Sequence, residues 1–195
     1  MANQAITTYK ITGTRQAVNH LWSTLQEMEV NSHSVSLNHL AEYYAIQCQT
    51  KQIRVNGHIY WAEYNEDLTN DHYLLSFETE TAWDACNELF DEINHMLLDK
   101  LSISYRVCES GCDVYYVHDR GNFFSEEVAV SSCGAPFDDV CDDLFATLKD
   151  AINFWCDKMN INQGERTDEE MIDFINEYEY DDEDTYFYIH QFTFE

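Results

Sequence analysis

The stretch that decides the fold is Tyr73-Leu-Leu-Ser-Phe-Glu-Thr-Glu-Thr-Ala-Trp83, which leads into two further periodic segments. Its residues Tyr73, Leu75 and Phe77 alternate at the two-residue period of a β-strand. Helical spacing follows, at Trp83, Cys86, Leu89, Phe90, Ile93 and Leu97. A second alternating run, 101–107, then closes the segment. The pattern therefore predicts a strand, a helix over 82–98 and another strand.

The same periods extend the prediction outward in both directions. Residues 5–12 are rich in β-branched side chains and predict a first strand. Thr14 is a candidate N-cap for a helix over 14–28, whose apolar positions are Val18, Leu21, Trp22, Leu25 and Met28. A hairpin is expected around Asn56-Gly57, with strands over 51–55 and 58–62, and short strands are expected between 114 and 130.

This order of elements indicates an α+β fold. A strand-helix-strand, strand-helix-strand order is typical of a ferredoxin-like antiparallel sheet with two helices on one face. We expect residues 5–130 to form that sheet, within a core domain over 1–135. Trp22 and Trp83 fall on the apolar helix positions and should be buried against the sheet, where replacement by Ala would cost about 3–5 kcal/mol.

The aromatic strand into Thr81-Ala82-Trp83, the strand 101–107 and the turns Glu109–Gly111 and Asp119-Arg-Gly121 resemble the YubB-type ferredoxin-like proteins of plasmids and phages. The resemblance covers residues 5–130. It implies a protein of a mobile element and no established chemistry, so it transfers no functional residue. Where that family carries an Asn-Trp-Gly motif, this chain has Trp61-Ala-Glu-Tyr-Asn65.

After Pro136 the composition changes to an acidic extension over 136–195. One apolar stripe, formed by Val140, Leu144, Leu148, Ile152 and Trp155, predicts a helix over 137–155. Thr167-Asp-Glu-Glu170 is a capping box that predicts a second helix. The aromatic run 186–194 predicts a strand. That strand should either join an edge of the sheet or pair with a partner chain, because an exposed aromatic strand would aggregate.

The charge is extreme and uneven. The chain holds 10 Lys and Arg against 37 Asp and Glu, a formal net charge of -27, whereas a magnitude of about 2–8 is enough to keep a small domain soluble. Residues 101–195 carry -18 of this charge. Such a surface disfavours binding to nucleic acid or to an anionic membrane. It favours a basic protein as the partner, most simply a nucleic-acid-binding host protein.

Ten carboxylates of the extension are the predicted partner-binding site, and we expect them to be exposed. They are Asp138, Asp139, Asp142, Asp143, Glu177, Glu179, Asp181, Asp182, Glu183 and Asp184. One interpretation is an acidic protein that imitates nucleic acid and inhibits a host nuclease or defence protein. The alternative is a scaffold or assembly subunit that recognises its partner through the aromatic strand, with solvated surface charge.

Catalytic, metal and targeting signatures are absent from the sequence. It has no Gly-rich phosphate loop, nucleophile elbow or H-E-x-x-H stretch, so we expect neither an enzyme nor a cofactor. Cys108 and Cys112, with His118 and Cys133, could supply zinc ligands, but C-x2-C pairs are missing and no metal is expected. Three other cysteines, Cys86, Cys141 and Cys156, should be buried in helices. Without a signal peptide or a long apolar run, we expect a cytoplasmic protein.

Overall fold

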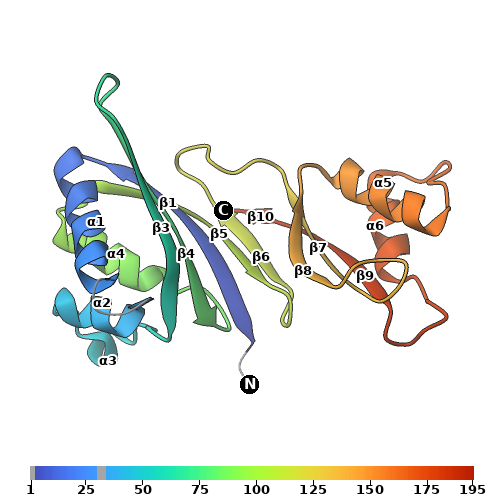
Figure 1. Cartoon of the computed structure of the whole chain (residues 1–195), viewed down its shortest axis with the longest axis horizontal. Helices are drawn as coiled ribbons and strands as arrows, with labels where there is room; N and C mark the ends of the chain where they lie inside the picture. The colour runs from blue at the N-terminus through green and yellow to red at the C-terminus, as the bar shows by residue number, and fades with distance from the viewer. Residues whose placement is uncertain (1–2, 30–33) are drawn as a thin grey trace. The chain divides into compact units, whose positions relative to one another are not determined.

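The computed structural model describes residues 3–29 and 34–195, and the chain divides into two compact units (Figure 1). The first unit comprises Met1–Phe123 and Glu195, and the second comprises Phe124–Phe194. The division lies earlier than the boundary predicted at residue 135. The difference arises because the segment Val128–Cys133, predicted as part of the core sheet, pairs with strands of the second unit.

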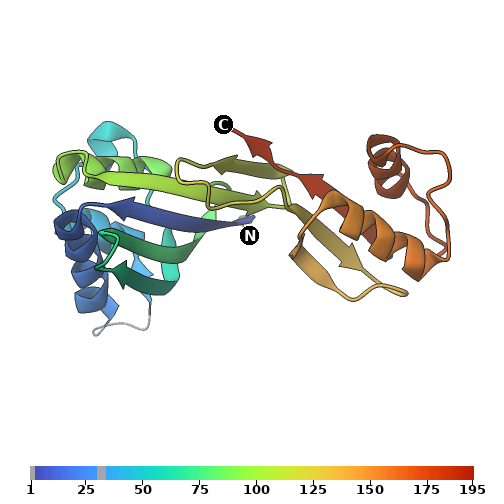
Figure 2. The ribbon, with the colours of Figure 1, turned by 90° about the horizontal axis from the view of Figure 1, so that it is seen from above.

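The first unit is a mixed α and β structure. Its elements are β1 (Gln4–Gly13), α1 (Arg15–Glu29), β2 (Val35–Ser36), α2 (Leu37–Tyr43), α3 (Cys48–Lys51), β3 (Gly57–Asp67), β4 (His72–Ala82), α4 (Asn87–Met96), β5 (Leu101–Glu109) and β6 (Val114–His118). Within the unit the strands follow the order β6-β5-β1-β4-β3-β2, and each pair is antiparallel. The strands β1, β4 and β5 lie side by side in both views (Figures 1 and 2).

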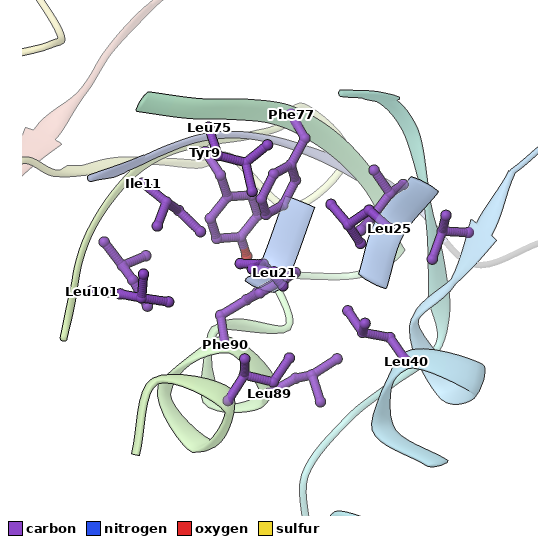
Figure 3. Packing of buried hydrophobic residues seen from close by; sticks show 14 of the residues in the cluster. Tyr9, Ile11, Leu21, Leu25, Leu40, Leu75, Phe77, Leu89, Phe90 and Leu101 are labelled. Atoms are coloured by element: carbon purple, nitrogen blue, oxygen red, sulfur yellow. The ribbon is translucent and has the colours of Figure 1, made fainter. Parts of the chain in front are cut away.

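One hydrophobic cluster fastens the helices to this sheet. The rings of Tyr9, Phe77 and Phe90 have centroids 4.6–5.1 Å apart and form its centre (Figure 3). Leu21 of α1 and Leu40 of α2 are fully buried in the same cluster. Because α1, α2 and α4, the last through Phe90, contribute buried residues to one cluster, these three helices cover the same face of the sheet. The alternation of Tyr73, Leu75 and Phe77 produces that face, as all three side chains are buried.

The prediction that Trp83 is buried is wrong. Its side chain is 50% exposed. Strand β4 continues to Ala82, and the Trp83 N–H then donates to the carbonyl oxygen of Asn3 at 2.9 Å. Helix α4 begins only at Asn87, so Trp83 lies in the connection before the helix and has a positive φ of 73°. Trp22 is partly buried, with its ring stacked on Tyr64 at 6.0 Å.

The second unit contains β7 (Val128–Cys133), β8 (Val140–Phe145), α5 (Leu148–Met159), α6 (Asp168–Asn176), β9 (Tyr186–Gln191) and β10 (Thr193–Phe194). Three of its strands form an antiparallel sheet in the order β8-β7-β9. Helices α5 and α6 lie on the same side of that sheet (Figure 1). Trp155 of α5 is fully buried and packs with Val130, Met171 and Phe187 in one cluster. None of the helices in the described residues is both long and apolar enough to cross a membrane.

Candidate functional site

The first group of predicted carboxylates lies on a hairpin, whereas the sequence predicted a helix over 137–155. Asp138 and Asp139 are in the turn between β7 and β8, and Asp142 and Asp143 are in β8. Strand β8 is held by pairing with β7, and α5 begins only after Thr147, whose Oγ1 accepts the Asp150 N–H at 3.1 Å. The apolar stripe from Val140 to Trp155 continues past the N-cap at Thr147 without a break, so the sequence pattern predicted one helix where the structure has a strand and a helix. These four carboxylates are therefore not stabilised by a helix dipole.

Two of the hairpin carboxylates, Asp139 and Asp142, accept hydrogen bonds that stabilise the hairpin. Asp139 Oδ1 accepts the Gly134 N–H at 2.9 Å, and this bond and the Cys133 thiol lower the pKa of Asp139. Asp142 is only partly exposed, and its Oδ1 accepts the Ser131 hydroxyl at 3.2 Å. Asp138 and Asp143 are exposed. The local bonds give Asp139 and Asp142 a structural role that the sequence pattern did not indicate.

The second group forms the loop between α6 and β9, and all six of its carboxylates are exposed, as predicted. They are Glu177, Glu179, Asp181, Asp182, Glu183 and Asp184, here called the C-terminal acidic cluster. The loop is ordered by Asp182, whose Oδ1 accepts the Asp184 N–H and whose carbonyl accepts the Thr185 N–H, both at 3.0 Å. Across residues 3–29 and 34–195, no Lys or Arg forms an ion pair with the cluster.

Negative charge is favourable at the start of α6 and unfavourable at its end. At its start, Thr167 and Glu170 form a capping box, and the first turn is acidic, which the helix dipole favours. The last turn contains no basic residue, and Glu177 is the C-cap. A negative charge there is disfavoured by about 0.3–1 kcal/mol. The beginning of the C-terminal acidic cluster therefore lowers local stability, so helix capping does not explain its presence.

The few basic residues of the second unit interact with groups outside the C-terminal acidic cluster. Residues 124–194 hold 19 Asp and Glu against 3 Lys and Arg. Lys149 Nζ lies 3.3 Å from Asp168 Oδ1, Lys158 Nζ lies 5.4 Å from the centre of the Phe154 ring, and the Arg166 guanidinium lies 4.2 Å from the Phe174 ring centre. The three cations thus stabilise the helical side of the unit and leave the C-terminal acidic cluster without compensation.

A hollow of about 440 Å³ lies beside the cluster, between the loop and β9. Three of its lining residues are acidic, Glu179, Asp182 and Glu183, and the others include Tyr178, Tyr180, Tyr186 and Tyr188. The loop is anchored beneath the hollow, because Trp155 Nε1 donates to the Tyr180 hydroxyl oxygen at 2.8 Å. The site therefore combines carboxylates with aromatic rings on a fixed support.

The structure brings together only part of the ten-residue site predicted from the sequence. Cys133 at the end of β7 pairs with Tyr186 at the start of β9. Since the hairpin turn follows Cys133 and the cluster ends just before Tyr186, this pairing places the turn and the cluster at the same end of the sheet. The carboxylate of Asp139 raises the pKa of the Cys133 thiol. Asp142 and Asp143 lie on β8, and β7 separates them from β9.

The cysteines considered as zinc ligands from their spacing lie in different surroundings. Cys108 is buried and Cys112 is exposed. Within the described part of the chain, no group of three or more His, Cys, Asp or Glu could hold a metal ion. Cys86 is buried as expected, and its burial raises the pKa of the thiol to about 11. The prediction for Cys141 is wrong, since it is exposed on β8, and Cys156 is only partly buried.

A network of hydrogen-bonded polar side chains in the first unit is a second candidate site. The Tyr9 hydroxyl donates to Asn87 Oδ1 at 2.7 Å, and Tyr116 donates to Asp84 Oδ1 at 2.9 Å. Asn87 Nδ2 joins these two hydrogen bonds by donating to the Tyr116 hydroxyl oxygen at 3.3 Å. Arg54 extends the network through an ion pair with Asp84 at 3.1 Å. Burial raises the pKa of both tyrosines, which keeps them protonated. This arrangement fastens the start of α4 and activates neither hydroxyl.

The outer edge of β9 is covered by a side chain. Asn176 at the end of α6 donates from Nδ2 to the Ile189 carbonyl at 3.0 Å and accepts the Ile189 N–H at Oδ1, at 2.8 Å. Asn94 of α4 does the same for Leu101 of β5, at 3.2 and 2.8 Å. The amide of Asn176 occupies the position that a neighbouring strand would take, so β9 is not open to strand pairing at Ile189.

Replacing Asn176 by Ala is expected to lower the free energy of unfolding of the second unit by about 1–3 kcal/mol, because one backbone donor and one acceptor lose their partners. Chemical denaturation measures this loss. Asn153 is exposed on α5 and provides the control, since Asn153→Ala should change stability by less than about 0.5 kcal/mol. Equal losses in the two variants would contradict the assigned role of Asn176.

The sequence analysis missed the exposed rings of Tyr186 and Tyr188. Phe187 and Ile189 are buried, whereas the two tyrosines are 38% and 42% exposed. The two-residue period of β9 and the difference between Tyr and Phe could have assigned these faces.

Comparison of the chain with protein-family models, curated proteins and solved structures finds no match. The assignment of function therefore rests on the chemistry of the site.

Proposed function

We propose that the chain is a cytoplasmic interaction protein whose second unit binds a basic protein through the C-terminal acidic cluster. The observation that carries the proposal is the placement of six exposed carboxylates in the loop after α6. The first of them, Glu177, opposes the helix dipole, and none of the six forms an ion pair with a Lys or Arg among the described residues. Groups that lower local stability are most common at functional sites. The complementary ligand is a positively charged surface.

The proposed partner is a nucleic-acid-binding host protein, such as a nuclease or another defence protein, which the chain inhibits by imitating the charge of phosphates. Nucleic-acid-binding proteins present clustered Lys and Arg to their ligands, and the same cations would meet the acidic cluster. An origin in a plasmid or phage is part of the proposal and is supported by the sequence resemblance to YubB-type proteins. The β5-β1-β4-β3 strand order, with α1 and α4 in the connections, supports a ferredoxin-like fold for the first unit.

The alternative function is a scaffold or assembly subunit that binds its partner through the C-terminal aromatic strand, by adding a strand to β9. The hydrogen bonds between Asn176 and Ile189 weigh against this alternative, because they occupy the edge of β9 that an added strand would need.

An enzymatic function is not proposed. The pKa values of the Cys48, Cys86, Cys133 and Cys156 thiols are all raised, whereas a nucleophilic thiol needs a lowered pKa.

The proposal is tested by capture and competition. The chain is immobilised and exposed to a bacterial lysate at low salt, and bound protein is eluted at high salt. We expect a basic protein that binds duplex DNA, and we expect DNA and the soluble chain to compete for it in a fluorescence-anisotropy titration. Simultaneous binding of DNA and the chain would contradict the imitation of nucleic acid. Capture that persists at high salt would contradict an electrostatic interface.

A further inference from the structure

Two tyrosines form an aromatic platform on β9. The rings of Tyr186 and Tyr188 have centroids 5.4 Å apart and an interplanar angle of 21°. Both rings are partly exposed, at 38% and 42%, while Phe187 between them is buried in the core. The strand thus holds two nearly parallel rings at the surface at little entropic cost, since Phe187 and Ile189 fix the backbone that carries them.

The platform and the acidic cluster line the same hollow. Its volume of about 440 Å³ is near the lower end of the roughly 300–1,000 Å³ that is usual for ligand sites. The residues that line it include Tyr186 and Tyr188 of the platform and Glu179, Asp182 and Glu183 of the cluster. Lysine and arginine are the protein side chains that combine a positive charge with a stem able to reach into such a hollow.

We infer that the hollow receives an arginine side chain of the basic partner, an inference that rests on the proposed function. A guanidinium is planar, stacks on aromatic rings and donates two parallel hydrogen bonds to one carboxylate. Both kinds of residue line the hollow, tyrosines with exposed, stacked rings on β9 and carboxylates on the loop. A lysine ammonium is a compact, strongly hydrated charge that gains less from ring stacking. The structure therefore assigns a preference for arginine over lysine to this surface.

The probes are hexa-arginine and hexa-lysine peptides, titrated into the full chain by isothermal titration calorimetry at low salt. Stacking of a cation on an exposed ring contributes about 0.5–1 kcal/mol, so we expect the chain to bind hexa-arginine about two- to fivefold more tightly than hexa-lysine. The Tyr186→Phe, Tyr188→Phe double variant keeps both rings and should keep this ratio. The Tyr186→Leu, Tyr188→Leu variant should reduce the ratio to about that of a simple acidic surface.

Tyr43 and Tyr60, which are 50% and 55% exposed in the first unit, supply a matched control. The Tyr43→Leu, Tyr60→Leu variant should bind both peptides as the original chain does. Equal affinity of the original chain for the two peptides would overturn the inference, as would an arginine preference that survives Tyr186→Leu, Tyr188→Leu. If both peptides bind equally and weaken with salt, only the arginine site fails. If neither peptide binds, the proposed function fails with it.

Discussion

Replacing Trp155 by Ala is expected to reduce the free energy of unfolding of the second unit by about 3–5 kcal/mol. Its side chain is fully buried, and its ring packs edge-on against Phe174 and Tyr178, with centroids 5.8 and 5.2 Å away. The substitution also removes the N–H donor to Tyr180. Since Tyr180 belongs to the acidic loop, the variant should lose partner binding together with stability.

Hydrogen exchange followed by mass spectrometry separates the two units in this variant. Peptides from β7 and β9 should lose protection, whereas peptides from β1 and β4 should keep it. Trp83→Ala is the control, because Trp83 is 50% exposed and its removal should cost less than about 1 kcal/mol. A loss below about 1 kcal/mol for Trp155→Ala would show that the core of the second unit is misassigned, and a loss well above 1 kcal/mol for Trp83→Ala would contradict the exposed position of Trp83 in the first unit.

The first unit could be predicted from local periodicity to a large extent. Alternation at Tyr73, Leu75 and Phe77 indicated both the strand and its buried face, and helical spacing at Leu89, Phe90 and Ile93 indicated α4. Boundaries were less predictable, because the pairing of β1 with β4 extends β4 to Ala82 and displaces Trp83 from the helix. The residues predicted as a strand over 51–55 include the end of α3, and β3 instead pairs with β4 and β2.

The second unit was harder to predict because two patterns overlap in it. Val140 and Leu144 fit the same four-residue spacing as Leu148 and Ile152, although they belong to a strand and the latter pair to a helix. Only the pairing of β8 with β7, a contact between segments separated in sequence, distinguishes the two. The capping box at Thr167 was predictable, since all of its partners lie within four residues.

The candidate site was predictable in its charge but not in its geometry. Composition alone located the C-terminal acidic cluster, and its six carboxylates are exposed. The structural roles of Asp139 and Asp142 depend on Gly134 and Ser131, across the hairpin, and were not predictable. The hollow beside Tyr186 and Tyr188 depends on how the loop after α6 returns to β9, which no local pattern encodes.

Neutralising the C-terminal acidic cluster is expected to weaken the complex with the basic partner by at least tenfold at low salt. The variant replaces Glu177, Glu179 and Glu183 by Gln and Asp181, Asp182 and Asp184 by Asn. Exposed charge pairs contribute about 0.2–1 kcal/mol each, so six together can account for this loss. The fold should be unchanged or slightly more stable, because Glu177 no longer opposes the dipole of α6.

A matched control separates the position of the charges from their number. It neutralises six other exposed acids, Glu63, Glu126, Asp157, Glu165, Glu169 and Asp173, so that the net charge changes from -27 to -21 in both variants. Long-range attraction depends on net charge and should fall equally in the two. A local interface should fall only when the cluster is altered.

The most direct test is a binding titration of the original chain and both variants against the basic protein recovered at low salt, at two salt concentrations. We expect the cluster variant to bind at least tenfold more weakly, the control variant to bind within about threefold of the original chain, and the difference to shrink as salt screens the charges. Equal affinities of the two variants, or an affinity of the original chain that does not change with salt, would contradict the proposal that the C-terminal acidic cluster is the binding site.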